Sequence, residues 1–154
     1  MPIPTKDLDI FHLFQQAHDP KAGAVVLFSG EVRDNSLGKP VKCLEYEAFE
    51  AMAEKMIHEI VAAAKEKWHL NKVIAQHRIG EVEVGGTAVV VITCSPHRKE
   101  AYAANRYIID RIKHEAPIWK CEHFEDGTKE WGGNCSCQKI TGDANKHVYE
   151  FDES

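Results

Sequence analysis

The chain has 154 residues, of which 44% are hydrophobic and 28% charged, and its formal net charge is −5 at pH 7. These values exclude a disordered chain and predict one soluble domain with a sizeable core, and the negative charge argues against nucleic acid as a partner. With no apolar run long enough for a membrane span and no signal-peptide pattern, we expect a cytoplasmic protein that does not bind a membrane.

The first half of the chain predicts a helix, two strands and a long helix. Residues 7–18 have the pattern of a short amphipathic helix, and residues 22–32 are a β-rich run typical of a buried strand. Residues 33–40 are rich in Asn, Ser, Gly and Pro, and we expect an irregular loop there. Residues 41–48 predict a second strand. Residues 49–68 place apolar side chains at three- and four-residue steps, which predicts a long helix packed on the core.

The second half repeats the two strands and the long helix and adds a hairpin. Residues 72–84 predict one strand, in which His77 and Arg78 are structural or peripheral, and Gly85-Gly86 turns into a buried strand over residues 87–94. Ser95 is the expected N-cap of a helix that reaches about residue 115. The elements together predict an α+β sandwich, in which an antiparallel or mixed sheet carries two long helices on one face. We expect this domain to span residues 1–131 and residues 132–154 to be a polar, partly ordered tail.

Two lysines flank the predicted hairpin of residues 116–131. Lys120 follows an apolar Pro-Ile-Trp segment, and Lys129 follows the Asp126-Gly127 turn. If both arms are extended, the two lysines lie near each other. A lysine pair of this kind suits an anionic substrate, and a desolvated lysine can act as acid, base or nucleophile. The alternative is an ordinary hairpin whose lysines point into water.

Further cations occur at the ends of predicted elements. His97, Arg98 and Lys99 occupy the first turn of the second long helix, where the helix dipole disfavours positive charge unless an anion binds there. They can equally extend into water at a small cost. Arg33 lies in the loop after the first strand, and its planar fork suits a phosphate or carboxylate. These residues are candidates for one cationic pocket.

The cysteines suggest a weaker alternative. Five cysteines without a secretory signal do not predict a disulfide framework. Cys121, His123, Cys135 and Cys137 supply four soft ligands, but the cysteines of structural zinc sites are usually separated by two to four residues, and here by one. We therefore expect free thiols and no metal centre. A metal-dependent protein built on this set is kept as a minor hypothesis.

Several motifs in register resemble one family. The runs GAVVLFSGEVRDNSLG (Gly23–Gly38), HRIGEV (His77–Val82), SPHR (Ser95–Arg98) and APIWK (Ala116–Lys120) are similar to those of the large, catalytic subunit of molybdopterin synthase. The resemblance implies an α/β hammerhead fold with a small β-rich subdomain. It also implies a sulfurtransferase that converts cyclic pyranopterin monophosphate into molybdopterin, without a cofactor of its own.

The resemblance further implies partners. The sulfur arrives as a thiocarboxylate on the Gly-Gly C-terminus of a small ubiquitin-like subunit, and the family forms a heterotetramer around a dimer of the large subunit. A non-catalytic dimeric platform that only grips the C-terminus of such a partner is the alternative function.

The resemblance also implies roles for individual residues of this chain, according to the motif in which each lies. Lys120 in APIWK corresponds to the key lysine, for proton transfer or transient attachment of the incoming acyl group, and Lys129 is the expected second lysine of the site. Arg33 corresponds to an anion-binding arginine. His97 and Arg98 correspond to a pair that reaches across the dimer into the neighbouring pocket. The expected pocket-lining residues are Phe28 and Ile118.

Overall fold

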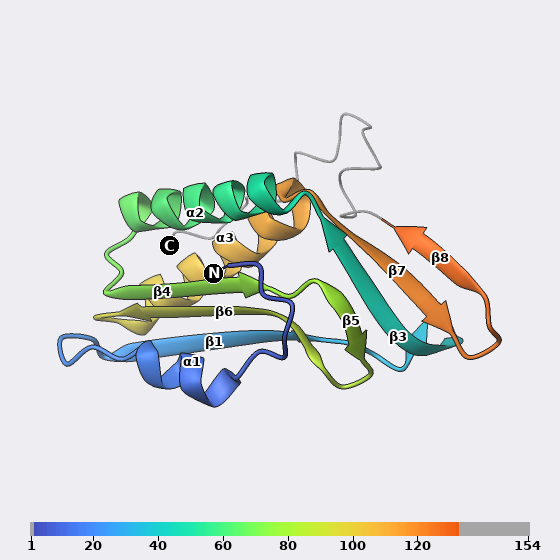
Figure 1. Cartoon of the computed structure of the whole chain (residues 1–154). Helices are drawn as coiled ribbons and strands as arrows, with labels where there is room; N and C mark the ends of the chain where they lie inside the picture. The colour runs from blue at the N-terminus through green and yellow to red at the C-terminus, as the bar shows by residue number, and fades with distance from the viewer. Residues whose placement is uncertain (1, 133–154) are drawn as a thin grey trace.

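The computed structural model describes residues 2–132 and consists there of two antiparallel sheets and three helices (Figure 1). Their bounds in chain order are α1 Ile10–Gln16, β1 Ala24–Glu31, β2 Asn35–Ser36, β3 Lys39–Ala48, α2 Glu50–Lys67, β4 Lys72–His77, β5 Gly80–Glu83, β6 Thr87–Ser95, α3 Arg98–Glu115, β7 Ile118–Phe124 and β8 Lys129–Gly132. The predicted α+β class is confirmed. The tail expected over residues 132–154 lies, except for Gly132, outside the described residues, so the domain boundary stays a prediction.

The first sheet has the strand order β1-β6-β4 and forms the centre of the molecule. Its middle strand β6 is buried at every position from Ala88 to Ser95, as its continuous apolar run predicts. The long helices α2 and α3 cover one face, while α1 lies against the other (Figure 1). The two long helices thus share one face, as predicted, and the short α1 lies on the other face because β6 points Val90 and Ile92 toward it.

The larger core lies between the first sheet and the two long helices. Its fully buried side chains include Ile57 and Ile60 of α2 and Ile108 and Ile112 of α3. Both helices thus bury the apolar stripe that their sequence predicts. The amide of Asn105 fastens α3 to the sheet, since its Nδ2 donates to the carbonyls of Val26 at 3.0 Å and Val91 at 2.9 Å.

The second sheet has the order β2-β3-β7-β8, with β5 paired to β3 as well. It extends from one end of the first sheet as a small β-rich unit (Figure 1). The predicted hairpin around Asp126-Gly127 is confirmed as β7 and β8, with Gly127 in a left-handed turn at φ 87°. Because β7 follows α3 directly, this sheet stays attached to the helical layer.

The prediction of an irregular loop over residues 33–40 is wrong. Asn35 pairs with Pro40 and Ser36 with Lys39, so the segment is a short hairpin. Its two-residue turn has Leu37 at φ 52° and Gly38 at φ 80°, the left-handed pair that a primed turn requires. Leucine seldom adopts this conformation, so the composition of the segment did not indicate the turn.

The prediction of a single strand over residues 72–84 is also wrong. The segment is divided into β4 and β5, which belong to different sheets. Past β4, the amide of Ile79 donates to the carbonyl of Pro4 at 3.0 Å, and Gly80 has φ 90°, so the chain turns away between the sheets. His77 and Arg78, at this break, are buried.

The predicted N-cap of α3 is displaced by two residues. Ser95 is the last residue of β6, paired with Ala24, and the N-cap is His97, whose side chain makes no capping bond. The Ser95 hydroxyl donates to the carbonyl of His97 at 2.5 Å. Within residues 2–132, no helix combines the length and apolar character that crossing a membrane requires.

Candidate functional site

A cavity of about 240 Å³ lies where the two sheets meet the C-terminal end of α3. Its lining comes from the end of β1, the loop and β2 that follow, β3, β6, α3 and β7. Both charged and apolar side chains contribute. The small β-rich unit, the first sheet and a long helix therefore all border this one space.

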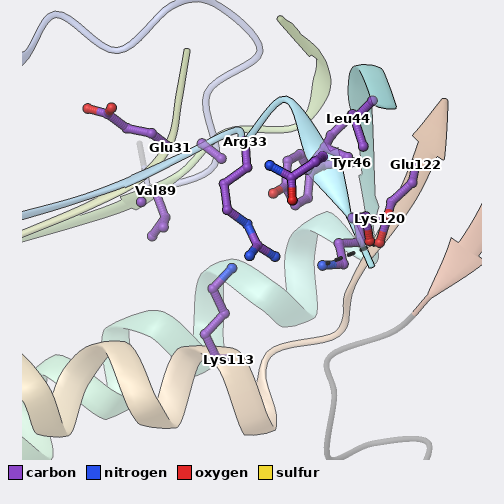
Figure 2. Close-up of a pocket in the computed structure, with 13 residues that line it drawn as sticks. Glu31, Arg33, Leu44, Tyr46, Val89, Lys113, Lys120 and Glu122 are labelled. Atoms are coloured by element: carbon purple, nitrogen blue, oxygen red, sulfur yellow. Dashed lines mark ion pairs between the residues drawn. The ribbon is translucent and has the colours of Figure 1, made fainter. Parts of the chain in front are cut away.

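Three cationic side chains from separate elements line this cavity. Arg33 comes from the loop after β1, Lys113 from the last turn of α3 and Lys120 from β7. Figure 2 shows Lys113 extending from α3 toward the guanidinium of Arg33, with Lys120 on the neighbouring wall. Like charges that point toward one space favour the binding of an anion there.

Backbone hydrogen bonds on both sides hold Arg33 in place. The amide of Val32 donates to the carbonyl of Gly86 at 3.0 Å, and the carbonyl of Val32 accepts from Gly85 at 2.8 Å. On the other side, the carbonyl of Asp34 accepts from the amide of Val41 at 2.8 Å. The loop that carries the arginine is therefore anchored to both sheets, although the side chain of Arg33 is exposed.

Lys120 has an acidic neighbour on its own strand. Its Nζ lies 3.8 Å from Oε1 of Glu122, which points to the same side of β7. The side chain of Lys120 is 42% exposed and that of Glu122 is 19% exposed. A cation and a carboxylate held this close, at the edge of solvent, can exchange a proton with a bound molecule.

Tyr46 is the register partner of Lys120 across β3 and β7 and also lines the cavity. Burial, with a smaller contribution from the charge of Glu122, raises the pKa of Tyr46 to about 12. The phenol therefore stays protonated at neutral pH and is a hydrogen-bond donor to whatever the cavity holds.

His77 packs behind Tyr46, with its ring edge-on at 4.9 Å between centroids. It is fully buried, and its Nδ1–H donates to the carbonyl of Arg78 at 2.8 Å. Burial, and to a lesser extent the charge of Lys113, lowers the pKa of His77 to about 3. A neutral imidazole thus supports the floor of the site without adding to its charge.

The structure does not bring Lys129 into this cavity. On β8, Lys129 pairs with His123 of β7, and Lys120 pairs with Gly132. Because His123 and Lys120 are three residues apart, their side chains lie on opposite faces of the sheet, and Lys129 shares the face of His123. The expected proximity of the two lysines is therefore wrong. The assignment of Lys129 to the active site stays a prediction.

The remaining predicted residues lie elsewhere. His97 and Arg98 are exposed at the start of α3, and Arg98 is about 22 Å from Lys113 along the helix at 1.5 Å per residue. They do not join the cavity within one chain. Ile118 does not line it either: only 3% exposed, it belongs to the larger core, because its end of β7 is covered by the helices. Phe28 lies just outside, with its ring against the position of Gly30, which does line the cavity.

Sequence analysis missed Lys113, Tyr46 and Glu122. Lys113 has the ordinary appearance of a basic residue in the last turn of a helix, which the helix dipole favours. Tyr46 and Glu122 could be recognised only weakly from the sequence. Each lies two residues from another cavity-lining residue on its own strand and therefore points to the same side of the sheet. Recognising them needs the pairing of β3 with β7.

Comparisons with known proteins agree with one another. The family model described as MoaE protein matches residues 3–115, a range that includes Arg33 and Lys113 and ends before Lys120. A molybdopterin synthase catalytic subunit from a Nostoc species is 44% identical over 133 residues, which cover 86% of this chain and 81% of the relative.

Solved structures show the same likeness. The crystal structure of molybdopterin synthase from Staphylococcus aureus superposes with a TM-score of 0.81 at 39% identity, covering 86% of this chain and 96% of that one. A chain from the protein–protein complex of subunits 1 and 2 of the Helicobacter pylori molybdopterin-converting factor has a TM-score of 0.71, covering 84% of this chain and 88% of that one. At 23% identity, this second likeness is one of fold.

Proposed function

This chain belongs to the MoaE family of molybdopterin synthase catalytic subunits, and on that premise we propose that the cavity lined by Arg33, Lys113 and Lys120 is its active site. The protein is a sulfur-transferring enzyme of molybdenum cofactor biosynthesis. The observation that supports the site is the meeting of three cations from three elements in a chain whose net charge is −5. Glu31 and Glu122 also line the cavity, and the three cations beside them still offer an anion a favourable place to bind.

The reaction of this family brings two anions together. The substrate, cyclic pyranopterin monophosphate, carries a phosphate, and the small ubiquitin-like subunit presents a thiocarboxylate at its C-terminus. Arg33 and Lys113 point toward one another across the cavity (Figure 2), so we assign the phosphate to the space between them. To Lys120, on the adjacent wall, we assign the thiocarboxylate.

Lys120 is the residue to which we assign the chemistry. The thiocarboxylate sulfur bonds to the pterin and displaces an oxygen there. Water then adds to the resulting thioester carbonyl and breaks its carbon–sulfur bond, which leaves a carboxylate on the small subunit. The ammonium of Lys120 can donate a proton to the departing sulfur, and the carboxylate of Glu122, 3.8 Å from it, can accept one from the water. The phenol of Tyr46, paired with Lys120, donates a hydrogen bond to the same space. If Lys120 instead attacks the carbonyl, an acyl-lysine adduct forms, which intact-mass measurement would reveal.

We also propose that the enzyme works as a dimer of this chain with a small subunit at each end. Within one chain, His97 and Arg98 are a helix length from Lys113, so they can serve a cavity only if a second copy presents them. Phe28 lies beside Gly30, and we assign it to the entrance through which the C-terminus of the partner passes. A cytoplasmic location is part of this proposal, and cell fractionation tests it.

A single-turnover assay tests the site. It combines this protein with a thiocarboxylated ubiquitin-like small subunit and cyclic pyranopterin monophosphate, and it follows dithiolene formation. We expect Lys120→Ala to lose turnover by at least about a hundredfold while it still binds the small subunit, since removal of a proton-transfer group typically costs 10²–10⁴ in rate.

Two matched variants sharpen this test. Lys42→Ala removes an exposed lysine of β3 that does not line the cavity, and its turnover should equal that of the unchanged protein. Lys129→Ala decides the role of the second lysine, because a residue on the reverse face of the sheet should matter little. Undiminished turnover in Lys120→Ala would refute the assignment.

A further inference from the structure

The sheet face opposite Lys120 gathers three side chains able to bind a metal ion. Glu45 on β3 is the register partner of Cys121 on β7, and His123 lies two residues further along β7 on the same face. One ligand atom from each residue, the carboxylate oxygen, the thiol sulfur and an imidazole nitrogen, lies within 4.8 Å of the other two. The cluster therefore joins two strands and is separate from the active-site cavity.

The ligand types and spacing suit a tetrahedral divalent ion. Zinc binds thiolate, imidazole and carboxylate at about 2.0–2.3 Å, which places neighbouring ligand atoms about 3.3–3.8 Å apart. His123 Nε2 and Glu45 Oε1 are already 3.2 Å apart. The contraction needed at the sulfur is at most about 1.0–1.5 Å, which the flexible side chain of Glu45 and the ring of His123 can provide.

The burial of the three groups also fits a site that is open on one side. Cys121 is fully buried and forms the floor, while the side chains of His123 and Glu45 are 33% and 40% exposed. An ion can thus reach the cluster from solvent, and water can complete its coordination. Without an ion, the imidazole and the carboxylate form a half-exposed hydrogen bond that contributes little to stability.

We propose that Glu45, Cys121 and His123 bind a divalent cation with the preferences of zinc and so fasten β3 to β7. The short spacing of the cysteines argued against a metal centre, and the fold adds a ligand from a distant strand that spacing does not reveal. The role is structural, because Lys120 and Glu122 alternate onto the other face of β7. The ion therefore supports the strand that carries the active-site lysine without entering the cavity.

The thiol chemistry provides a measurable signature. Metal binding requires the thiolate form of Cys121, so loading releases the proton of the thiol. Binding should therefore weaken as the pH falls, and proton release should accompany loading.

Titration of the chelator-treated protein with Co²⁺ tests the proposal. We expect one ion per chain, thiolate-to-cobalt charge-transfer absorption in the near ultraviolet, tetrahedral bands in the visible, and displacement by Zn²⁺. The variants Cys121→Ser, His123→Gln and Glu45→Gln should each weaken Co²⁺ binding at least tenfold. Loading should raise the melting temperature of the unchanged protein and not that of the variants.

Two controls separate this site from the other thiols. Cys43 pairs with His123 but does not belong to the cluster, and Cys94 lies in the first sheet. The variants Cys43→Ser and Cys94→Ser should therefore both bind Co²⁺ normally. A double variant of Cys135 and Cys137, which lie outside the described residues, should keep the affinity within tenfold. Absence of Co²⁺ binding, or binding lost only in that double variant, would overturn the proposal. Circular dichroism of each variant establishes that it is folded.

The metal test is independent of the sulfur-transfer assay. We expect the chelator-treated protein to retain turnover at moderate temperature and to lose it at a lower temperature than the loaded protein. A failed assignment of Lys120 would leave the Co²⁺ titration unaffected, and a failed titration would leave the active site unaffected.

Discussion

Tyr46 and Lys120 are direct partners across β3 and β7, and both side chains line the same cavity. A protonated phenol beside Lys120 provides a hydrogen-bond donor whose state does not change near neutral pH. The pair therefore separates two tasks, since Tyr46 can orient a bound group and Lys120 can carry its proton.

Tyr46→Phe should lower turnover by about 2- to 10-fold, the range expected from loss of one hydrogen bond worth 0.5–1.5 kcal/mol. Because the pKa of Tyr46 is about 12, the ratio of the two rates should stay constant between about pH 6 and pH 9. Single-turnover rates across that range check this. Tyr102→Phe, which alters an exposed tyrosine of α3, is the control. A ratio that changes with pH would show that Tyr46 ionises during the reaction.

Arg33→Ala should raise the KM for cyclic pyranopterin monophosphate by about 10- to 100-fold, since a charge-assisted hydrogen bond is worth about 1.5–3 kcal/mol. Arg33→Lys should recover only part of the loss, because lysine lacks the planar fork. Since Arg33 is exposed, salt should weaken substrate binding less in the alanine variant than in the unchanged protein. Steady-state kinetics at two salt concentrations measure both effects. A KM equal to that of the unchanged protein would place the phosphate elsewhere.

His77 should make the protein less stable as the pH falls. Its pKa is about 3 when folded, below the ordinary value of 6.5, so the unfolded chain binds the additional proton between these two pH values. Stability is therefore complete above about pH 6.5 and decreases toward pH 3, by up to about 1.4 kcal/mol per pH unit from this group. Urea denaturation of His77→Gln, compared with the unchanged protein at pH 7 and pH 5, should show a smaller loss in the variant. Equal losses would contradict a buried neutral imidazole.

Asn105→Ala should lower the free energy of unfolding by about 1–3 kcal/mol, because two carbonyls beneath α3 lose their side-chain donor. Arg106→Ala, one residue further on the same helix and with a 73% exposed side chain, should change it by less than about 0.5 kcal/mol. Chemical denaturation measures both. Similar values for the two variants would show that Asn105 does not fasten the helix to the sheet.

Much of the fold could be predicted because it depends on local patterns. The apolar stripes of α2 and α3, the continuous run of β6 and the Asp126-Gly127 turn each specify their own element. The hairpin at Leu37 escaped prediction, since it needs a left-handed leucine that pairing with β3 stabilises. The break after His77 depends on hydrogen bonds to the N-terminal segment, which no pattern within residues 72–84 reveals.

The candidate site was harder to predict because it depends on register and distance. Arg33 and Lys120 were found through their motifs, but the face on which Lys129 lies depends on the length of one turn, since a shift of one residue reverses every side chain of β8. Lys113 enters the site through the packing of α3 on the first sheet, and Tyr46 through the pairing of β3 with β7. Their positions follow from tertiary structure alone.

The length of α3 has a consequence for the activity measured at different protein concentrations. The helix separates Arg98 from Lys113 by about 22 Å, so a cavity that uses Arg98 must obtain it from another copy. Specific activity should then fall on dilution below the dissociation constant of the dimer. Mixing Lys120→Ala with Arg98→Ala chains, each inactive alone, should restore about a quarter of the sites, because half of the dimers are mixed and each of these has one intact cavity.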